Sequence, residues 1–258
     1  MHPVGGQNVI GYQSVGCGPS KIVMLHDWLG DRTTYEPILP YLDEARFTWV
    51  FPDLRGYGLS RHLEGFSLDQ AVADLTELAD HLGFGSFAVA GHSMSGMVAM
   101  KLALALPERV TAVVLAAPVT AGGLDLDDDT RAFFESVAVD RSACRNIVAA
   151  VTGNRYGDVW LDHKARRSRE TATDAARSGY LKNMLLGGGF ADELAGYAMP
   201  TLVVTGAHDA DGFREADVRD KLGPAAAGSR FETIHEAGHY PMQETPVRYA
   251  ALLHDFLS

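Results

Sequence analysis

A strand, a tight turn and a buried helix follow one another near the middle of the chain, and this unit restricts the fold more than any other feature. The strand is predicted over residues 86–90 and the helix over residues 94–106, where small and apolar residues lie almost all round the axis. A helix that is apolar on every side must be buried. The unit is therefore typical of a mostly parallel sheet with helices packed on both faces.

The rest of the chain continues this alternation of strands and helices. Short apolar runs predict further strands over residues 21–26, 47–51, 110–116, 201–205 and 231–234. Amphipathic patterns predict helices over residues 67–82 and 247–257, and Ser67 is the expected N-cap of the first. We therefore predict an α/β fold with a mostly parallel, doubly wound sheet. In such sheets, ligands bind outside the carboxyl ends of the strands.

Residues 119–199 interrupt this alternation. Helical patterns with apolar faces replace it, and three consecutive glycines, 187–189, stand near the end of the segment. We predict that the segment is an inserted helical cap, that residues 1–118 and 200–258 form the core domain, and that the glycines provide a flexible connection. The segment also contains charged runs, which we expect to face solvent; the basic run comprises Lys164, Arg166, Arg167 and Arg169.

Composition and charge argue against several classes of function. The chain has 258 residues and a formal net charge of −11, which disfavours nucleic acid or an anionic membrane as a partner. Its two cysteines, Cys17 and Cys144, provide neither a disulfide framework nor a paired metal spacing. We see no secretory signal and no apolar run long enough to span a bilayer. We therefore expect a cytoplasmic protein that acts on a small molecule without a cofactor or metal; nothing indicates an oligomeric state.

Ser93 stands in the turn between the central strand and its helix, which is the setting of a nucleophile elbow. The usual motif is Gly-x-Ser-x-Gly, and here Ser95 occupies the place of the second glycine. A serine nucleophile needs a base, usually a histidine that a carboxylate orients. Asp209 and His239 each follow a predicted strand, and the chain order of the three residues is that of α/β-hydrolase triads. Asp211 is the alternative acid.

Five segments together resemble the α/β-hydrolase superfamily over nearly the whole chain outside the insertion. Residues 24–30 (MLHDWLG) resemble its oxyanion loop, and residues 51–60 (FPDLRGYGLS) match the loop after the next strand. Residues 91–94 (GHSM) match the elbow, residues 206–209 (GAHD) the acid loop and residues 238–239 (GH) the histidine loop. The resemblance implies that Ser93 attacks an electrophilic carbon, that His239 transfers the proton and that Asp209 orients His239. It also implies that the main-chain N–H groups of Trp28 and Met94 hold the oxyanion.

Several polar residues near these motifs have expected structural roles. His26 should staple neighbouring loops, His92 should pack beside the elbow, and Asp53 and Arg55 should fix the loop after their strand. Asp27 stands where the family usually has glycine, and a carboxylate there would oppose the charge of an oxyanion. We therefore predict that Asp27 turns away from the oxyanion hole and pairs with Arg55, with His26 or His92 as alternative partners.

These motifs predict a serine hydrolase that cleaves a small or medium apolar ester or lactone through an acyl-enzyme on Ser93. The residues expected in its substrate pocket are Asp27, His92, Phe133, Phe134, Trp160, Met184 and Tyr240. The same triad in this superfamily also supports cleavage of carbon–carbon bonds and cofactor-free perhydrolysis. Some relatives use it to sense a small molecule, so these alternatives stay open.

Overall fold

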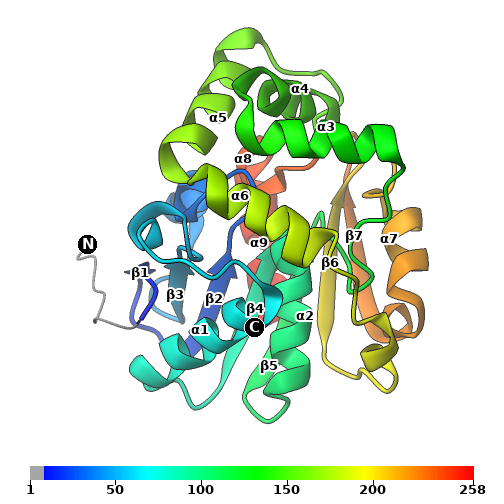
Figure 1. Ribbon diagram of the computed structural model, residues 1–258. Helices are drawn as coiled ribbons and strands as arrows, with labels where there is room; N and C mark the ends of the chain where they lie inside the picture. The colour runs from blue at the N-terminus through cyan, green and yellow to red at the C-terminus, as the bar shows by residue number, and fades with distance from the viewer. Residues whose placement is uncertain (1–8) are drawn as a thin grey trace.

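A single sheet of seven strands runs through the computed structural model, which describes residues 9–258 (Figure 1). The strand order is β1-β3-β2-β4-β5-β6-β7; β1 is antiparallel to β3, and the other neighbours are parallel. The strands are β1 Tyr12–Val15, β2 Ser20–Leu25, β3 Phe47–Pro52, β4 Phe87–His92, β5 Val110–Ala116, β6 Thr201–Gly206 and β7 Ser229–Ile234. The predicted mostly parallel sheet is confirmed. Residues 1–8, which the predicted core domain includes, lie outside the described part of the chain.

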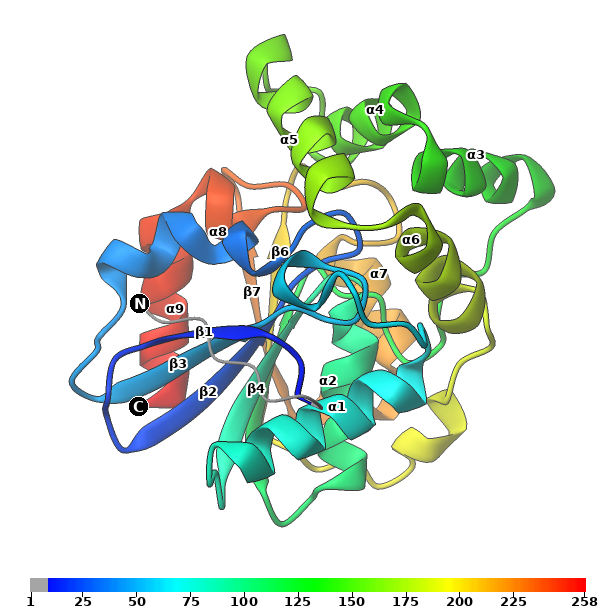
Figure 2. The ribbon, with the colours of Figure 1, turned by 60° about the vertical axis from the view of Figure 1, so that its left-hand side comes forward.

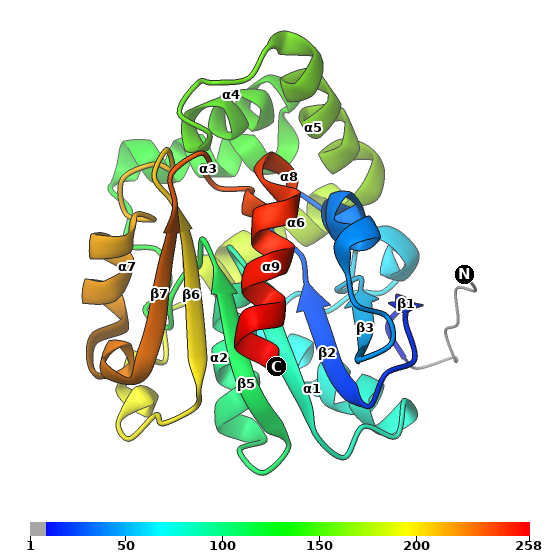
Figure 3. The ribbon, with the colours of Figure 1, turned by 180° about the vertical axis from the view of Figure 1, so that it is seen from behind.

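Helices cover both faces of this sheet (Figures 2 and 3). On one face lie α1 (Leu68–His81) and α2 (Ser95–Ala105), and on the other α9 (Pro246–Leu257) packs with the 3₁₀ helix η1 (Arg32–Tyr41). Because α2 packs between α1 and the strands β4 and β5, it is buried almost all round, as its sequence predicts. The shorter elements of the core are η2 Gly58–Ser60, α7 Glu215–Leu222, η5 Gly223–Gly228 and α8 Pro241–Glu244.

The burial of the strands explains which of them the sequence reveals. Every residue of β3, β4 and β6 is buried, and parallel strands that are covered on both faces read as continuous apolar runs. The strand β1 was not predicted, because it is a half-polar edge strand of four residues. Ser67 accepts a hydrogen bond from the N–H of Gln70 and so caps α1 as predicted.

Four helices fill the segment between β5 and β6, and Figure 1 shows them above the carboxyl ends of the strands. They are α3 Asp128–Val139, α4 Arg141–Val151, α5 Asp158–Thr171 and α6 Asp174–Tyr180, followed by the π-helical turn η3 Leu181–Leu185 and the 3₁₀ turn η4 Ala191–Leu194. They therefore cover the edge of the sheet at which ligands bind in this class of fold. Within residues 9–258, no helix is both long and apolar enough to cross a membrane.

Each of the three glycines after η3 has a local reason to be glycine, either close neighbouring backbone or a left-handed conformation. A Cβ atom at Gly187 would be 2.6 Å from the carbonyl oxygen of Asn183, and one at Gly189 would be 2.1 Å from that of Ala121. Gly188 has a φ of +82°, a conformation that residues with a side chain rarely adopt. Local geometry alone accounts for the three glycines, and their proposed flexibility stays a prediction.

Candidate active site

Ser93 lies in a strained turn between β4 and α2. Its φ is +53°, in the left-handed region that non-glycine residues rarely adopt. Glycines allow the close approach of backbone on both sides of this turn. A Cβ atom at Gly91 would be 2.1 Å from the carbonyl oxygen of Ser95, and one at Gly96 would be 2.7 Å from that of Val119. The turn thus has the shape of a nucleophile elbow, in which Gly96 supplies the second close approach.

Three of the predicted site residues come together at the carboxyl edge of the sheet. His239 lies in the loop between β7 and α8, with its Nε2 2.8 Å from Oγ of Ser93. Its Nδ1 is 2.8 Å from Oδ2 of Asp209, which follows β6, and all three side chains are buried. Asp211, the alternative acid, is exposed and pairs with Arg214. A chain from carboxylate to imidazole to hydroxyl lets a histidine remove the proton of a serine.

The surroundings of His239 favour its protonated form. Burial by itself lowers the pKa of an imidazole, but the carboxylate of Asp209 attracts the positive charge and accepts its hydrogen bond. The pKa of His239 is therefore raised above its usual value. Phe213 and Tyr240 make edge contacts with the ring and help to enclose it. An imidazole in this setting can accept a proton from the serine and hold it for a later step.

Trp28 follows β2 and lines the same cavity as Ser93. Its carbonyl accepts a hydrogen bond of 2.8 Å from the hydroxyl of Tyr57, and its indole N–H donates to the carbonyl of Arg177 at 2.9 Å. Among residues 9–258, no protein group accepts a hydrogen bond from the main-chain N–H of Trp28 or Met94. Free N–H groups close to a nucleophile are what an oxyanion hole requires.

Buried hydrogen bonds tie the elbow to the loops that follow β2 and β3. The N–H of Leu54 donates to Nε2 of His26 at 3.1 Å, so the other ring nitrogen carries the proton and donates to the carbonyl of Asp27 at 2.7 Å. His26 therefore has the structural role that we expected. The hydroxyl of Ser95 donates to the carbonyl of His26. The serine that replaces the second glycine of the motif thus joins the elbow to the loop after β2, a role that sequence reasoning missed.

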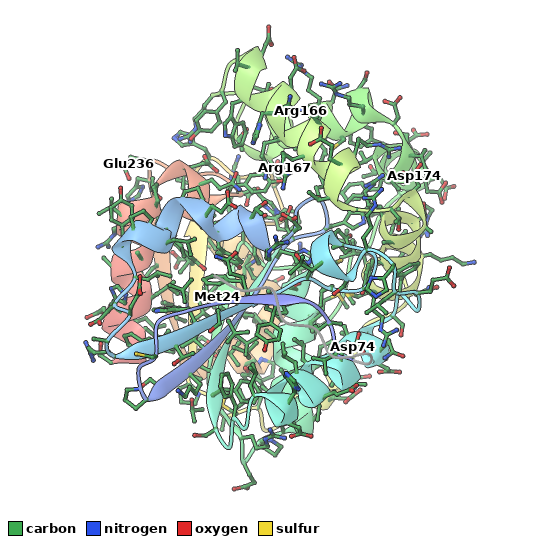
Figure 4. The ribbon with its side chains drawn as sticks, turned by 90° about the vertical axis from the view of Figure 1, so that its left-hand side faces the viewer. Met24, Asp74, Arg166, Arg167, Asp174 and Glu236 are labelled. Carbon is green, nitrogen blue, oxygen red and sulfur yellow. The ribbon has the colours of Figure 1, made fainter. Side chains whose placement is uncertain are left out.

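The predicted pair between Asp27 and Arg55 is wrong. The guanidinium of Arg55 donates to both carboxylate oxygens of Asp74, which lies on α1 (Figure 4), at 2.7 and 2.8 Å. A planar guanidinium can donate two parallel hydrogen bonds to the two oxygens of one carboxylate, and this arrangement is a strong one. Arg55 therefore fixes the loop after β3, as expected. Asp53 does the same by accepting a hydrogen bond of 2.8 Å from the N–H of Leu59.

Asp27 is buried and finds its partners close by. Its Oδ2 accepts a hydrogen bond from the N–H of Leu29 and its Oδ1 accepts one from the hydroxyl of Thr34, both at 3.2 Å. The Nδ1 of His92, an alternative partner in our prediction, is 3.7 Å from Oδ1 and has no hydrogen bond within the described chain. Burial favours the neutral acid, but attraction to His92 and Lys164 outweighs burial and lowers the pKa of Asp27 to about 2.

A cavity of about 50 Å³ lies beside the serine and the histidine, and its wall is mainly apolar. We call it the serine cavity; it is lined by Asp27, Trp28, Leu29, Ser93, Val119, Leu124, Phe134, Ile147, Val151, Leu185, Phe213, His239 and Tyr240. Three of the predicted pocket residues, Asp27, Phe134 and Tyr240, are among them. Within residues 9–258, no group of three or more His, Cys, Asp or Glu side chains is placed to hold a metal ion.

The other four predicted pocket residues do not line the serine cavity. Phe133 is 37% exposed, because neighbouring residues of a helix point in directions about 100° apart and Phe134 takes the inward one. Met184 is buried in the core, and Trp160 lines a different cavity. His92 lies behind the triad, where its Nε2 donates to the carbonyl of His239 at 2.7 Å.

Comparison with known families identifies the fold that carries this site. The model of the alpha/beta hydrolase family matches residues 22–252. This chain belongs to the alpha/beta hydrolase family. Solved structures agree: a bromoperoxidase from Bacillus anthracis has a TM-score of 0.82 at 20% identity, over 96% of this chain and 95% of that one. An enol-lactonase from Burkholderia xenovorans has a TM-score of 0.79 at 22% identity, over 95% of each chain. At these identities, the two structures show the fold alone.

A curated member of the family is similar over nearly the full length. The pimeloyl-(acyl-carrier protein) methyl ester esterase of Nitrosomonas europaea is 29% identical over 252 residues, which cover 93% of this chain and 96% of that protein. Shorter matches carry the names lipase and epoxide hydrolase. Together with the family match, these relatives show that the chain is an alpha/beta-hydrolase enzyme.

Proposed function

We propose that this protein is a serine hydrolase that cleaves a small or medium apolar ester or lactone through an acyl-enzyme on Ser93. The observation that carries the proposal is the hydrogen-bonded chain of Ser93, His239 and Asp209, with 2.8 Å at each link, beside a mainly apolar cavity. The relative from Nitrosomonas europaea is named as a methyl ester esterase, which supports this class of bond.

The geometry suits acyl transfer in two steps. His239 takes the proton of Ser93 as Oγ attacks the carbonyl carbon, and the N–H groups of Trp28 and Met94 stabilise the oxyanion that forms. His239 then gives this proton to the leaving alkoxide, and the acyl group stays on Ser93. The same imidazole then takes a proton from a water molecule, whose oxygen attacks the acyl carbon. As the bond from this carbon to Oγ breaks, His239 gives the proton to Oγ, which restores Ser93 and releases the acid. Asp209 keeps the imidazole oriented and stabilises its charged form.

In this proposal, the helices α3–α6 form a cap that limits the size of the substrate. The serine cavity measures about 50 Å³, whereas a neighbouring cavity measures about 550 Å³, and Leu29 lines both. A short acyl chain suits the first cavity, and a longer one must extend towards the second. The cap side chains Phe134, Ile147 and Val151 line the serine cavity and favour an apolar group there.

A panel of esters, lactones and diketones tests the proposal, with wild type and Ser93→Ala assayed in parallel. We expect the wild type to hydrolyse short apolar esters or lactones and the variant to lose at least about a thousandfold in rate. Faster turnover of diketones than of esters would assign carbon–carbon cleavage instead, and formation of peracid from acid and peroxide would assign perhydrolysis. Capture of one equivalent without turnover would indicate a small-molecule sensor.

A further inference from the structure

Lys164 is a buried cation within the proposed cap. It belongs to the basic run that we predicted to face solvent, yet only 8% of its surface is exposed, so that prediction is wrong for this residue. Leu161, Ala165 and Ser168 are buried with it, because these four positions share one face of α5. Arg166, on the same helix, shows the contrast: Figure 4 places it above the sheet, and its side chain is 55% exposed.

The ammonium group of Lys164 rests on aromatic rings rather than on acceptors. Its Nζ is 3.9 Å from the ring centroid of Tyr240 and 6.0 Å from that of Trp160. Within residues 9–258, Nζ donates no hydrogen bond and forms no ion pair with a carboxylate. Aromatic faces attract a cation but do not satisfy the three N–H donors of an ammonium. These donors are therefore available to a bound partner.

The carboxylates that attract Lys164 from further away have partners of their own. Burial lowers the pKa of Lys164, and attraction from Asp27, Asp31 and Glu244 opposes burial only in part. Asp27 accepts the two hydrogen bonds described above, and Asp31 caps η1. Glu244 pairs with Arg155 at 2.6 Å. Carboxylates thus attract the ammonium from a distance, but none in residues 9–258 accepts a hydrogen bond from it.

The neighbouring cavity of about 550 Å³, which we call the lysine cavity, reaches this ammonium. Lys164 and Trp160 line it from α5, and Thr34 lines it from η1. Tyr240, on whose ring the ammonium rests, lines the serine cavity, so the cation lies at the boundary between the two cavities. A chain that extends from a carbonyl group at Ser93 towards the lysine cavity would pass this cation.

We propose that Lys164 binds a carboxylate of the substrate, so that the preferred esters or lactones carry an acid group remote from the bond that is cleaved. This inference rests on the proposed hydrolase function and names its substrate class. One ammonium with free donors suits a carboxylate, which is a monoanion with two accepting oxygens. Apolar atoms between the two ends of the substrate would contact the wall of the serine cavity.

Paired ester series test this inference. Monomethyl esters of linear dicarboxylic acids are compared with methyl esters of the monocarboxylic acids of the same chain length. We expect the wild type to prefer the acid ester at one chain length. In Lys164→Met, the ratio of kcat/KM for the acid ester to that for the neutral ester should fall about tenfold to a hundredfold, mainly through KM. Lys182→Met, which removes an exposed lysine of the same segment, should leave the ratio unchanged.

A second variant and two outcomes keep this test decisive. Lys164→Gln removes the charge but keeps a polar head, and it should lower the ratio as well, so a folding defect in Lys164→Met does not end the test. If the wild type shows no preference for any acid ester, the inference is wrong. An equal fall for acid and neutral esters in both variants would show that Lys164 only balances Asp27, and this would overturn the inference too.

Binding without turnover separates this inference from the proposed function. In calorimetry, Ser93→Ala should bind the acid ester more tightly than the neutral one, and the double variant with Lys164→Met should lose the difference. If the wild type hydrolyses no ester but the difference in binding is present, the proposed function fails and the anion site stands. If the difference is absent, the inference fails whatever the kinetics show.

Discussion

The loops at the carboxyl edge of the sheet and the helices α3–α6 face the same cavity, but they present different kinds of side chain to it. The loops supply Ser93 and His239, which is hydrogen-bonded to Asp209 outside the cavity lining, and also apolar side chains such as Phe213. The helices supply apolar side chains such as Phe134 and, at the boundary of the cavity, the cation of Lys164. We therefore expect the loops to determine the reaction and the helices to determine the substrate. Changes in the loops should alter the rate on every substrate, whereas changes in the helices should alter the preference among substrates.

The largest effect should come from Ser93, the proposed nucleophile in the loop region. Ser93→Ala removes the attacking oxygen, so kcat should fall by at least about a thousandfold for every ester in a panel, whatever its size or charge. Steady-state kinetics measure this fall, and a serine-directed phosphonate should label the wild type once, at Ser93. If the fall in kcat differed between substrates, the loops would also select among substrates, and the contrast between loops and helices would not hold.

Ser95→Ala is the matched control for this prediction. Its hydroxyl donates a buried hydrogen bond to the carbonyl of His26 and does not belong to the triad. We expect a loss of about 1 kcal/mol in the free energy of unfolding, and a change in kcat of less than about tenfold. Phosphonate labelling at Ser95 would contradict both the assignment of the nucleophile and this structural role.

Asp209, the proposed acid of the triad, should have the next largest effect. Asp209→Asn removes the charge that stabilises the imidazolium of His239, and kcat should fall about a hundredfold to ten-thousandfold on all esters. Asp211→Asn should change kcat by less than about twofold, because Asp211 is exposed and pairs with Arg214. The reverse order of effects would show that the loop after β6 has another conformation in the working enzyme.

The pH profile gives Asp209→Asn a second readout. In the wild type, kcat/KM should fall as the pH drops through the raised pKa of His239, because only the neutral imidazole accepts the serine proton. Removal of the charge of Asp209 lowers this pKa. The acid limb of Asp209→Asn should therefore move to lower pH even though its maximum rate is smaller. A limb that does not move would show that another group controls the profile.

The core and the grouping of Ser93, Asp209 and His239 could be predicted because each of their signals lies within a few neighbouring residues. Continuous apolar runs locate β3, β4 and β6, since these strands are buried on both faces. The left-handed turn at Ser93 needs glycines nearby, and these are visible in the sequence. Asp209 and His239 follow strands whose carboxyl ends meet at one edge, so chain order was sufficient to bring them together.

The contacts of the inserted helices resisted prediction because they depend on packing between distant segments. Phe133 and Phe134 are equivalent in the sequence, and only the rotation of α3 decides which of them reaches the cavity. Lys164 looked like part of a solvated basic run, although its spacing from Leu161 and Ser168 could have indicated the buried face of α5. The partner of Arg55 lies on α1, and no local pattern distinguishes it from Asp27.

A smaller effect is expected at Asp27, where the two regions meet. An uncompensated carboxylate ~5 Å from the oxyanion, at an effective dielectric constant of ~20, would raise the barrier by roughly 3 kcal/mol, or about a hundredfold in rate. The charge is held by the N–H of Leu29 and the hydroxyl of Thr34, and Lys164 attracts it. We therefore expect Asp27→Asn to change kcat on neutral esters by at most about tenfold. A rise close to a hundredfold would show that this charge acts on the oxyanion without compensation.

The smallest effect should come from the apolar wall, and it should depend on the substrate. Phe134 stacks on Trp28, with ring centroids 5.8 Å apart, and lines the serine cavity, whereas Phe133 is 37% exposed and does not. Phe134→Ala removes apolar surface from the cavity, so KM should rise about fivefold for a medium-chain ester, equivalent to about 1 kcal/mol of binding. An acetate ester, which is too short to use this surface, should show little change, and Phe133→Ala should affect neither ester. If Phe134→Ala slowed both esters equally through kcat, the ring would be positioning Trp28 for the reaction, and the separation between loops and helices would not hold at this contact.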